Sequence, residues 1–446
     1  MLCRFGASSS DHGDSVQRRS VIFYDIAGYA ISRLIPAFLG VVTVIALSRL
    51  FGVVEYGRFA LVASAANTAS VIGVGWLTQS ILRFASGDRG WYQVHLRLIS
   101  KGFLASAIVG MLVVTTGLGL TLQEGIGPFA LLLAALLSCL LSSHAAVLAL
   151  LQAAMQVRGF ALLETVRALA VLAFSLAIVV FYSASYVSAI GGSVAALLCT
   201  TALGAVLLRS APQVQPTLTA GTGATESTGV AAFLRYGIPL SAWLGLSIAM
   251  PFVERVLIQR YTDAESLGVY AALYDMVFRG SGMVVMPIVM ALHPKIMALG
   301  RRGDEAGAKY LIIRGIGLQV LAATLVLAFL WVAGKWIVDL TIRPQLGGEV
   351  AYKLVIPLAL SGCVWHIALL SHKLLECRSR TGAMTVAMAC AIGVTIGCNV
   401  LALPIVGVLA TPYASAVGGV FYCMLVAMLS GTRGKPASEN TGKVNV

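Results

Sequence analysis

The chain has 446 residues, 59% of them hydrophobic and 11% charged, with a formal net charge of +13 at pH 7 and a mean hydropathy of +0.90. These values exclude a soluble globular domain and predict a polytopic all-α membrane protein, whose backbone polar groups must be satisfied within helices. Membrane β-strands are excluded as well, because the long Leu, Ala and Val runs show no alternation of inward and outward residues.

The predicted helices can be placed from stretches that lack charge. Ala168 to Leu208 and Thr381 to Thr432 contain no Asp, Glu, Lys or Arg, and each holds two lengths of about 20 apolar residues, the number that spans bilayer hydrocarbon. With charged or turn-rich segments as boundaries, the sequence predicts about twelve transmembrane helices of that length. They lie near residues 24–47, 59–82, 102–122, 127–152, 166–183, 187–208, 234–256, 268–291, 311–333, 351–373, 382–402 and 406–430.

The basic residues predict the orientation of these helices, since cytoplasmic loops retain positive charge. A cytoplasmic N-terminus places most of the 31 Lys and Arg residues on the inner side, and both termini are then cytoplasmic. The outer side keeps only Arg49, Arg58, Arg255, Arg260, Lys335, Arg343 and Lys353. The net charge follows from this bias, so we expect no nucleic-acid partner. The first apolar segment is too long for a cleaved leader, and we expect it to be retained.

An internal repeat divides the predicted helices into two halves. Arg49, Gly57, Phe59 and Ala60 recur 211 residues later as Arg260, Gly268, Tyr270 and Ala271. Because an even number of helices separates the copies, we expect two six-helix bundles related by a pseudo-two-fold axis along the membrane normal. The expected units are a tail at 1–23, bundles at 24–208 and 234–430, a flexible Thr- and Gly-rich cytoplasmic linker at 209–233, and a second tail at 431–446.

No motif predicts catalysis, a metal or a cofactor. The chain lacks the phosphate-binding pattern GxxxxGK[ST], CxxC and Cys/His metal spacings, and the predicted outer loops lack paired carboxylates or a Ser/His/Asp set. Most of the eight cysteines lie inside apolar runs, where they behave as small hydrophobic residues. We therefore expect a protein that is not an enzyme and binds neither a metal nor a cofactor.

Ionisable side chains within the predicted helices are the candidate functional residues, since each costs about 2.5–3.5 kcal/mol at a helix centre. Arg33 lies deep in the first helix, where it either faces a cavity or reaches the inner headgroups. Arg83, at the inner end of the second helix, has the same two alternatives. His144 and His366 also lie within helices, where a packed hydrogen bond is more common than a proton relay.

Two pairs of opposite charge lie in the seventh and eighth predicted helices. Asp275 and Arg279 are one turn apart near the middle of the eighth, so they share a face and can pair, and ligand contact is equally open. Glu254 and Arg255 end the seventh, where we expect an interfacial anchor or an inter-helix pair. Because these buried candidates are mostly cationic, they favour an anionic substrate.

The segments 47–60, 237–240, 254–258 and 267–273, together with the number of helices and the linker, resemble the polysaccharide-export branch of the multidrug/oligosaccharidyl-lipid/polysaccharide (MOP) flippase superfamily. The resemblance implies an O-antigen flippase of the Wzx type or a close relative in the bacterial inner membrane. Such a protein would move a polyprenyl-diphosphate-linked oligosaccharide to the outer leaflet by alternating access, coupled to an ion gradient. Membrane lipid, a polysaccharide polymerase and a chain-length regulator are the partners that this implies.

The resemblance also implies roles for the candidate residues. The arginines that would face the diphosphate or acidic sugars are Arg33, Arg279, Arg83 and Arg255. Asp275 and Glu254 would be either ion-coupling groups or structural partners, and the scarcity of acidic groups leaves the coupling site open. The regions around Gly57 and Gly268 would be structural turns.

Three other functions compete with this prediction. A drug or cation antiporter of the same superfamily would need an inward-facing acid, for which Asp275 is the deep candidate. An integral-membrane enzyme acting on the same lipid carrier would need paired acids or arginines on an outer loop. An assembly scaffold would tolerate replacement of its deep arginines.

Overall fold

The computed structural model describes residues 11–84, 89–121, 127–154, 156–209, 230–342 and 344–431. In these ranges the chain forms helices and no strand, which confirms the predicted all-α class. Side chains of residues 11–33 lie outside the description, as does nearly all of the predicted linker.

The first half of the chain forms five helices, and the first of them contains two membrane crossings. They are α1 (Asp11–Phe84), α2 (Arg89–Thr121), α3 (Pro128–Ala153), α4 (Val157–Phe181) and α5 (Tyr186–Arg209). Gly52 interrupts α1 with φ 79° and ψ 175°, a conformation that only glycine adopts readily. The predicted helices 24–47 and 59–82 are therefore joined by a break at one residue.

The second half repeats this plan with more irregular helices. Its elements are α6 (Val230–Tyr261), α7 (Ala264–Leu273), the π-helical turn η1 (Tyr274–Phe278), α8 (Arg279–Arg301), α9 (Glu305–Thr341), α10 (Pro344–Ser371), α11 (Lys373–Cys377), α12 (Thr381–Val406), the 3-10 turn η2 (Gly407–Leu409) and α13 (Ala410–Gly431). α7, η1 and α8 form one continuous crossing. Gly407, with φ 70°, separates α12 from α13 in the way that Gly52 divides α1.

These breaks account for the predicted number of crossings. Ten helical segments among the described residues are long and apolar enough to span a membrane. Two of them, Leu34–Phe84 and Thr381–Gly431, are 51 residues long, about 77 Å at 1.5 Å per residue, and each contains a glycine break. Because hydrocarbon is only about 30 Å thick, each holds two crossings, and the total is about twelve.

The turns lie at two ends of the molecule. The Gly52 end contains the breaks at Gly52 and Gly407 and the turns at 182–185 and 262–263. The linker end contains the connection between α3 and α4 and the turns at 302–304 and 378–380, together with the last residue of α5 and the first of α6.

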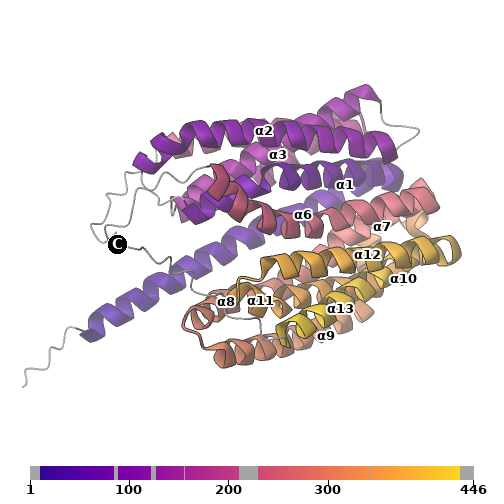
Figure 1. Cartoon of the computed structure of the whole chain (residues 1–446). Coiled ribbons are helices and arrows are strands. Elements are labelled where there is room, and N and C mark those ends of the chain that lie inside the picture. The colour runs from indigo at the N-terminus through magenta and orange to yellow at the C-terminus, as the bar shows by residue number, and fades with distance from the viewer. Residues whose placement is uncertain are drawn as a thin grey trace, which may run out of the picture.

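The helices form two bundles with α6 running between them beside α1 (Figure 1). The two bundles meet closely at the repeated motif. A Cβ built on Gly57 would lie 2.9 Å from Cα of Gly268, and one built on Gly268 would lie 1.9 Å from the carbonyl oxygen of Val53. Glycines that correspond in the repeat therefore contact one another, which places the pseudo-two-fold axis between them.

One side of the contact between the bundles is sealed along its whole length. The second half of α1 runs antiparallel to α6: Ser80 Oγ donates to the carbonyl of Phe233 at 2.8 Å, and Thr68 Oγ1 donates to that of Ile248 at 3.3 Å. A Cβ on Gly237 would meet the carbonyl oxygen of Trp76 at 2.2 Å. No substrate can pass between α1 and α6 in this conformation.

Candidate functional site

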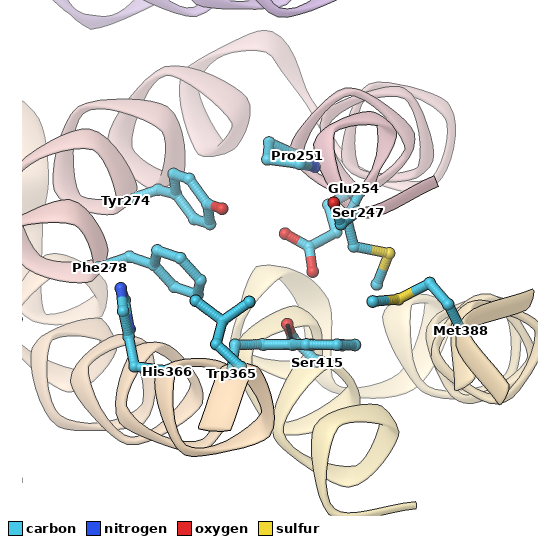
Figure 2. A pocket seen from close by; sticks show the side chains of 11 residues that line it. Ser247, Pro251, Glu254, Tyr274, Phe278, Trp365, His366, Met388 and Ser415 are labelled. Atoms are coloured by element: carbon cyan, nitrogen blue, oxygen red, sulfur yellow. Dashed lines mark hydrogen bonds between the residues drawn. The ribbon is translucent and has the colours of Figure 1, made fainter. Parts of the chain in front are cut away.

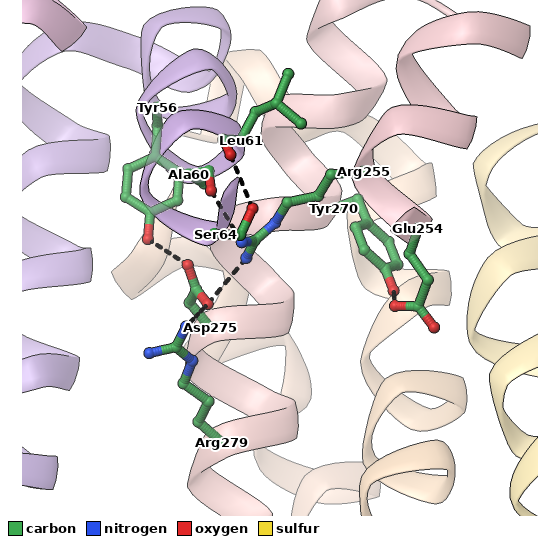
Figure 3. Close-up of polar contacts among 9 residues, drawn as sticks. All are labelled: Tyr56, Ala60, Leu61, Ser64, Glu254, Arg255, Tyr270, Asp275 and Arg279. Carbon is green, nitrogen blue, oxygen red and sulfur yellow. Dashed lines mark hydrogen bonds and ion pairs between the residues drawn. The ribbon is translucent and has the colours of Figure 1, made fainter. Parts of the chain in front are cut away.

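Asp275, on η1, is the centre of a buried polar network at the contact between the bundles (Figure 3). Its Oδ2 accepts a hydrogen bond from the Tyr56 hydroxyl, 2.9 Å away across the bundle boundary. Its Oδ1 accepts from Nη2 of Arg255 at 3.0 Å and lies 2.9 Å from Nη2 of Arg279. The pairing of Asp275 with Arg279 that the spacing predicted is therefore present, and one carboxylate serves two guanidinium groups.

Arg255 is buried and pairs with protein groups through both of its Nη atoms, while its Nε has no hydrogen-bond partner among the described residues. It is 1% exposed, and its Nη1 donates to the carbonyl oxygen of Ala60 in the other bundle at 3.0 Å. Its Cζ lies 5.5 Å from the centre of the Tyr274 ring. Removal of one partner of a buried ion pair strongly destabilises the folded protein, because the other charge stays buried without a partner. Replacement of either Arg255 or Asp275 should therefore destabilise the structure.

Arg279 lies near the middle of the crossing formed by α7, η1 and α8, yet 64% of its side chain is exposed. It borders a cavity of about 90 Å³ that separates α8 from the first half of α1. The cavity is lined by Ala37, Gly40, Val41, Val44, Asp275, Arg279 and Met283. Because only Nη2 of Arg279 is paired with Asp275, the remaining donors of this guanidinium can bind a ligand.

Of the other two predicted arginines, Arg83 lies outside this network and Arg33 cannot be placed relative to it. Arg83 is exposed in the last turn of α1 at the linker end, with its Cζ 5.0 Å from the centre of the Tyr236 ring. Arg33 lies in α1, but its side chain falls outside the described residues. The role predicted for Arg33 stays a prediction.

Glu254 lies inside the second bundle, on another face of α6 from its neighbour Arg255. Of the two alternatives for this pair, an interfacial anchor or an inter-helix pair, Arg255 makes the second through Asp275. Oε2 of Glu254 accepts from the Tyr270 hydroxyl at 2.7 Å, and Glu254 also bonds Ser415. Ser415 accepts from Nε1 of Trp365 at 3.1 Å. No guanidinium or ammonium group is hydrogen-bonded to Glu254 among the described residues.

Glu254 borders a cavity of about 160 Å³ enclosed by α6, η1, α10, α12 and α13 (Figure 2). The cavity is lined by Ser247, Met250, Pro251, Glu254, Tyr274, Phe278, Trp365, His366, Leu369, Met388 and Ser415. It therefore presents one carboxylate and a few hydroxyl groups on a wall of aromatic rings and thioethers. The described residues contain no group of three His, Cys, Asp or Glu that could hold a metal ion.

Both histidines in question make the packed hydrogen bonds that the sequence favoured. Nε2 of His144 lies 2.9 Å from Oε1 of Glu164, and Nδ1 of His366 bonds the carbonyl oxygen of Gly362. Sequence reasoning missed Glu164, because it placed this residue at the edge of a helix. It also missed Tyr56 and Tyr270 as hydrogen-bond partners of Asp275 and Glu254. Tyr270 is one of the repeated residues, and Tyr56 directly precedes the repeated Gly57, so the repeat could have drawn attention to both.

Among the described residues, the charged members of the Asp275 network and the carboxylate of Glu254 come from the second half of the chain. At the offset of 211 residues, Glu254, Arg255 and Asp275 correspond to Thr43, Val44 and Ser64. The repeat therefore preserves the glycine contact on the axis but not the charges beside it.

A family model described as "Polysaccharide biosynthesis protein" matches residues 23–300 of this chain. The chain belongs to this family. The resemblance seen in the sequence motifs is thereby confirmed. A search of curated proteins found no match.

Solved structures of MOP transporters share the fold of this family member. The lipid II flippase MurJ in an inward closed conformation is 12% identical, with 91% of this chain and 87% of that chain covered and a TM-score of 0.67. The eukaryotic MATE transporter AtDTX14 is 13% identical, with 94% and 96% covered and a TM-score of 0.61. A MOP superfamily transporter from Pyrococcus furiosus is 14% identical, with 91% and 94% covered and a TM-score of 0.58. Identities this low show a common fold and leave the substrate to be argued from the site.

Proposed function

We propose that this protein is a flippase that moves a polyprenyl-diphosphate-linked oligosaccharide of the O-antigen type from the cytoplasmic to the outer leaflet of the bacterial inner membrane. The observation that supports it most is Arg279, an exposed guanidinium deep between two bundles and beside a cavity. We place the linker end in the cytoplasm with both termini, because basic residues gather there. Transport of this kind makes and breaks no bond, so it requires no catalytic residue and no cofactor.

The chemistry of the headgroup explains why an arginine is needed. A diphosphate that enters hydrocarbon loses its hydration, and that loss is prohibitive unless fixed charges replace the water. The guanidinium group remains charged and presents a planar fork that matches two phosphate oxygens. Arg279 supplies this group about 23 Å along the crossing from Ala264, at 1.5 Å per residue.

Asp275 makes the binding of an anion at Arg279 reversible. Asp275 shares its single negative charge between Arg255 and Arg279, and it holds Arg279 through one contact of 2.9 Å. A diphosphate would replace the carboxylate as the partner of Arg279, while Arg255 and Tyr56 continue to hold Asp275. In this proposal Arg279 contacts the substrate, and Arg255 positions Asp275 and does not touch the substrate.

The two sides of the bundle contact differ in a way that suits a lipid-linked substrate. The side formed by α1 and α6 is sealed, whereas the side formed by the first half of α1 and α8 contains the cavity beside Arg279. Small residues of α1, including Ala37 and Gly40, line that cavity. We propose that the polyprenyl chain stays in the membrane at this side while the sugars cross between the bundles.

The conformation described here is closed at the Gly52 end. Tyr56 and Asp275, Arg255 and the Ala60 carbonyl, and the paired Gly57 and Gly268 all join the bundles near that end. A headgroup would therefore enter from the linker end, and its release requires these contacts to separate. Arg83, at the linker end, would meet the headgroup first, and Arg33 is proposed as a further contact on α1.

Glu254 is the stronger candidate for ion coupling. Asp275 is already paired with two guanidinium groups, whereas the hydrogen-bond partners of Glu254 are the neutral hydroxyls of Tyr270 and Ser415. A proton or a small cation that binds Glu254 therefore changes the net charge of the second bundle. We propose that this change in charge is coupled to the rocking of the two bundles.

The cavity around Glu254 also supports a second candidate function, a MATE-like antiporter for drugs or cations. A carboxylate among aromatic rings is suited to an organic cation. However, the cavity of about 160 Å³ is smaller than the roughly 300–1,000 Å³ of sites for drug-sized ligands. Its size suits water or a small ion, so we favour the flippase.

The remaining parts of the proposal concern organisation and partners. We propose bundles at residues 24–208 and 234–430 with the linker at 209–233 between them. A polysaccharide polymerase and a chain-length regulator are proposed partners, since the transported unit would be their substrate.

The test is complementation of a strain that lacks this gene, with surface polysaccharide as the readout. Arg279→Ala should reduce polysaccharide at least tenfold, because the anion would lose its partner deep between the bundles. Arg314→Ala is the matched control, since Arg314 is an exposed arginine on α9 whose Cζ lies 5.4 Å from the centre of the Tyr310 ring. Membrane abundance of each variant is measured in parallel. Normal polysaccharide from Arg279→Ala would remove the basis of the proposal.

A further inference from the structure

The first bundle contains a buried titratable cluster that the proposed transport site does not use. His144 on α3 and Glu164 on α4 are 4% and 7% exposed, and Nε2 of His144 lies 2.9 Å from Oε1 of Glu164. Arg167, three residues further along α4, donates from Nε to Oε1 at 3.1 Å and from Nη2 to Oε2 at 3.2 Å. The carboxylate of Glu164 is thus hydrogen-bonded to an imidazole ring and to a guanidinium group at the same time.

These contacts determine the state of the imidazole ring. The guanidinium of Arg167 spans both oxygens of Glu164, an arrangement that requires an ionised carboxylate. An ionised carboxylate only accepts hydrogen bonds, so Nε2 of His144 must carry a hydrogen and donate it. The ring is therefore neutral when its other nitrogen, Nδ1, has no hydrogen.

Nδ1 of His144 sets this cluster apart from a structural ion pair in which every polar atom is hydrogen-bonded. It is buried and makes no hydrogen bond with any described residue. A buried acceptor without a partner costs about 1–3 kcal/mol, and such atoms are uncommon in folded proteins. Because Nδ1 accepts no hydrogen bond from the described part of the protein, its lone pair is free to take up a proton, and the ring then becomes an imidazolium ion beside Glu164.

The charges around the ring act in opposite directions on an added proton, since Glu164 favours it and Arg167 opposes it. The charged groups that act on His144 are Glu164 and Arg167, both from α4, and no charged group of another helix does so among the described residues. Glu164 and Arg167 balance one another while the ring is neutral. After proton uptake the cluster carries one positive charge, and the hydrogen bond between the ring and Glu164 joins opposite charges.

We propose that His144 and Glu164 form a proton-binding site inside the first bundle, loaded at Nδ1 of His144. The ligand is a proton from water, and no other reactant is needed. His144 lies nine residues before Ala153, the last residue of α3, which is about 14 Å from the linker end. We therefore infer that protons reach it from that end. The site is separate from Glu254, which lies in the second bundle, and it does not depend on the proposed substrate.

The test follows the protonation of each ring nitrogen in the full-length protein. Protein labelled with ¹⁵N-histidine is placed in lipid nanodiscs, and nitrogen NMR spectra are recorded between pH 8 and pH 4.5. His144→Gln identifies the signals of His144 by their loss. We expect Nδ1 to change from an unprotonated to a protonated nitrogen on acidification, while Nε2 stays protonated throughout. An Nδ1 signal that remains unprotonated down to pH 4.5 would overturn the proposal.

Two comparisons establish the part played by the carboxylate. His366 is an internal control in the same spectra, because its Nδ1 bonds a backbone carbonyl and no carboxylate contacts its ring in the described structure. Glu164→Gln removes the charge that balances the imidazolium, so the ring of His144 should stay neutral at pH values at which the wild-type ring is charged. An unchanged titration of His144 in Glu164→Gln would also overturn the proposed pair. If this variant does not fold, the wild-type titration alone still decides whether Nδ1 binds a proton.

Discussion

Replacement of Tyr56 by Phe should open the Gly52 end without changing any charge. The hydroxyl of Tyr56 donates to Oδ2 of Asp275 at 2.9 Å, and this hydrogen bond joins the first bundle to the second (Figure 3). A hydrogen bond to a charged group contributes about 1.5–3 kcal/mol. If the bond exists only when the end is closed, its loss shifts the equilibrium between closed and open states about 10- to 150-fold toward open, at 1.4 kcal/mol for each factor of ten.

The shift can be measured as a distance between the bundles. Spin labels are introduced at Tyr182 and Ile405, two exposed residues at the Gly52 end on α4–α5 and α12, in a chain without its native cysteines. Pulsed electron paramagnetic resonance then gives the distribution of distances in lipid nanodiscs. In Tyr56→Phe the longer distances should gain population.

Tyr352→Phe is the matched control for this experiment. The Tyr352 hydroxyl donates to Oδ1 of Asp339 at 2.8 Å, but both residues belong to the second bundle. Its loss should therefore leave the distance between the labels unchanged. Identical distributions for Tyr56→Phe and the wild type would refute the view that the Tyr56 contact holds the bundles together.

Two further predictions concern the glycine contact and the buried acid. Gly57→Ala should lower both polysaccharide output and thermal stability, because the added Cβ would lie 2.9 Å from Cα of Gly268, whereas Gly119→Ala, with open space around it, should change neither. Equal effects of the two alanines would contradict a close helix contact at Gly57. Glu254→Gln should still move substrate down its own gradient in proteoliposomes but should lose the stimulation by an ion gradient, since the carboxamide cannot change its charge. Full stimulation in that variant would assign coupling to another residue.

Local features of the site could be predicted from the sequence, whereas contacts between distant segments could not. The spacing of Asp275 and Arg279 specified a shared helix face, and their 2.9 Å pair confirms that prediction. Glu254 and Arg255 gave no such information, because neighbouring residues on a helix point in different directions. Only the packing of α6 shows that Arg255 faces the first bundle and Glu254 the interior of the second.

The fold was easier to predict from the sequence than the site, because the fold depends on hydropathy averaged over long segments. Runs of about 20 apolar residues specify crossings whatever their exact packing. A single break such as Gly52, in contrast, leaves no signal in hydropathy, and the sequence placed a loop there. Tyr56 was assigned to that loop and its hydrogen bond to Asp275 was missed, since nothing local links residues 219 positions apart.

The loss of charge symmetry between the two repeats has a consequence for the path of the cargo. In the proposed mechanism, a headgroup bound to Arg279 would move with the second bundle and would lie off the central axis. The matching positions of the first bundle carry no charge, since Ser64 corresponds to Asp275 and Thr68 to Arg279. The two halves of the repeat would therefore have different roles: the second bundle would bind the headgroup through an ion pair, and the first bundle would move past it without one.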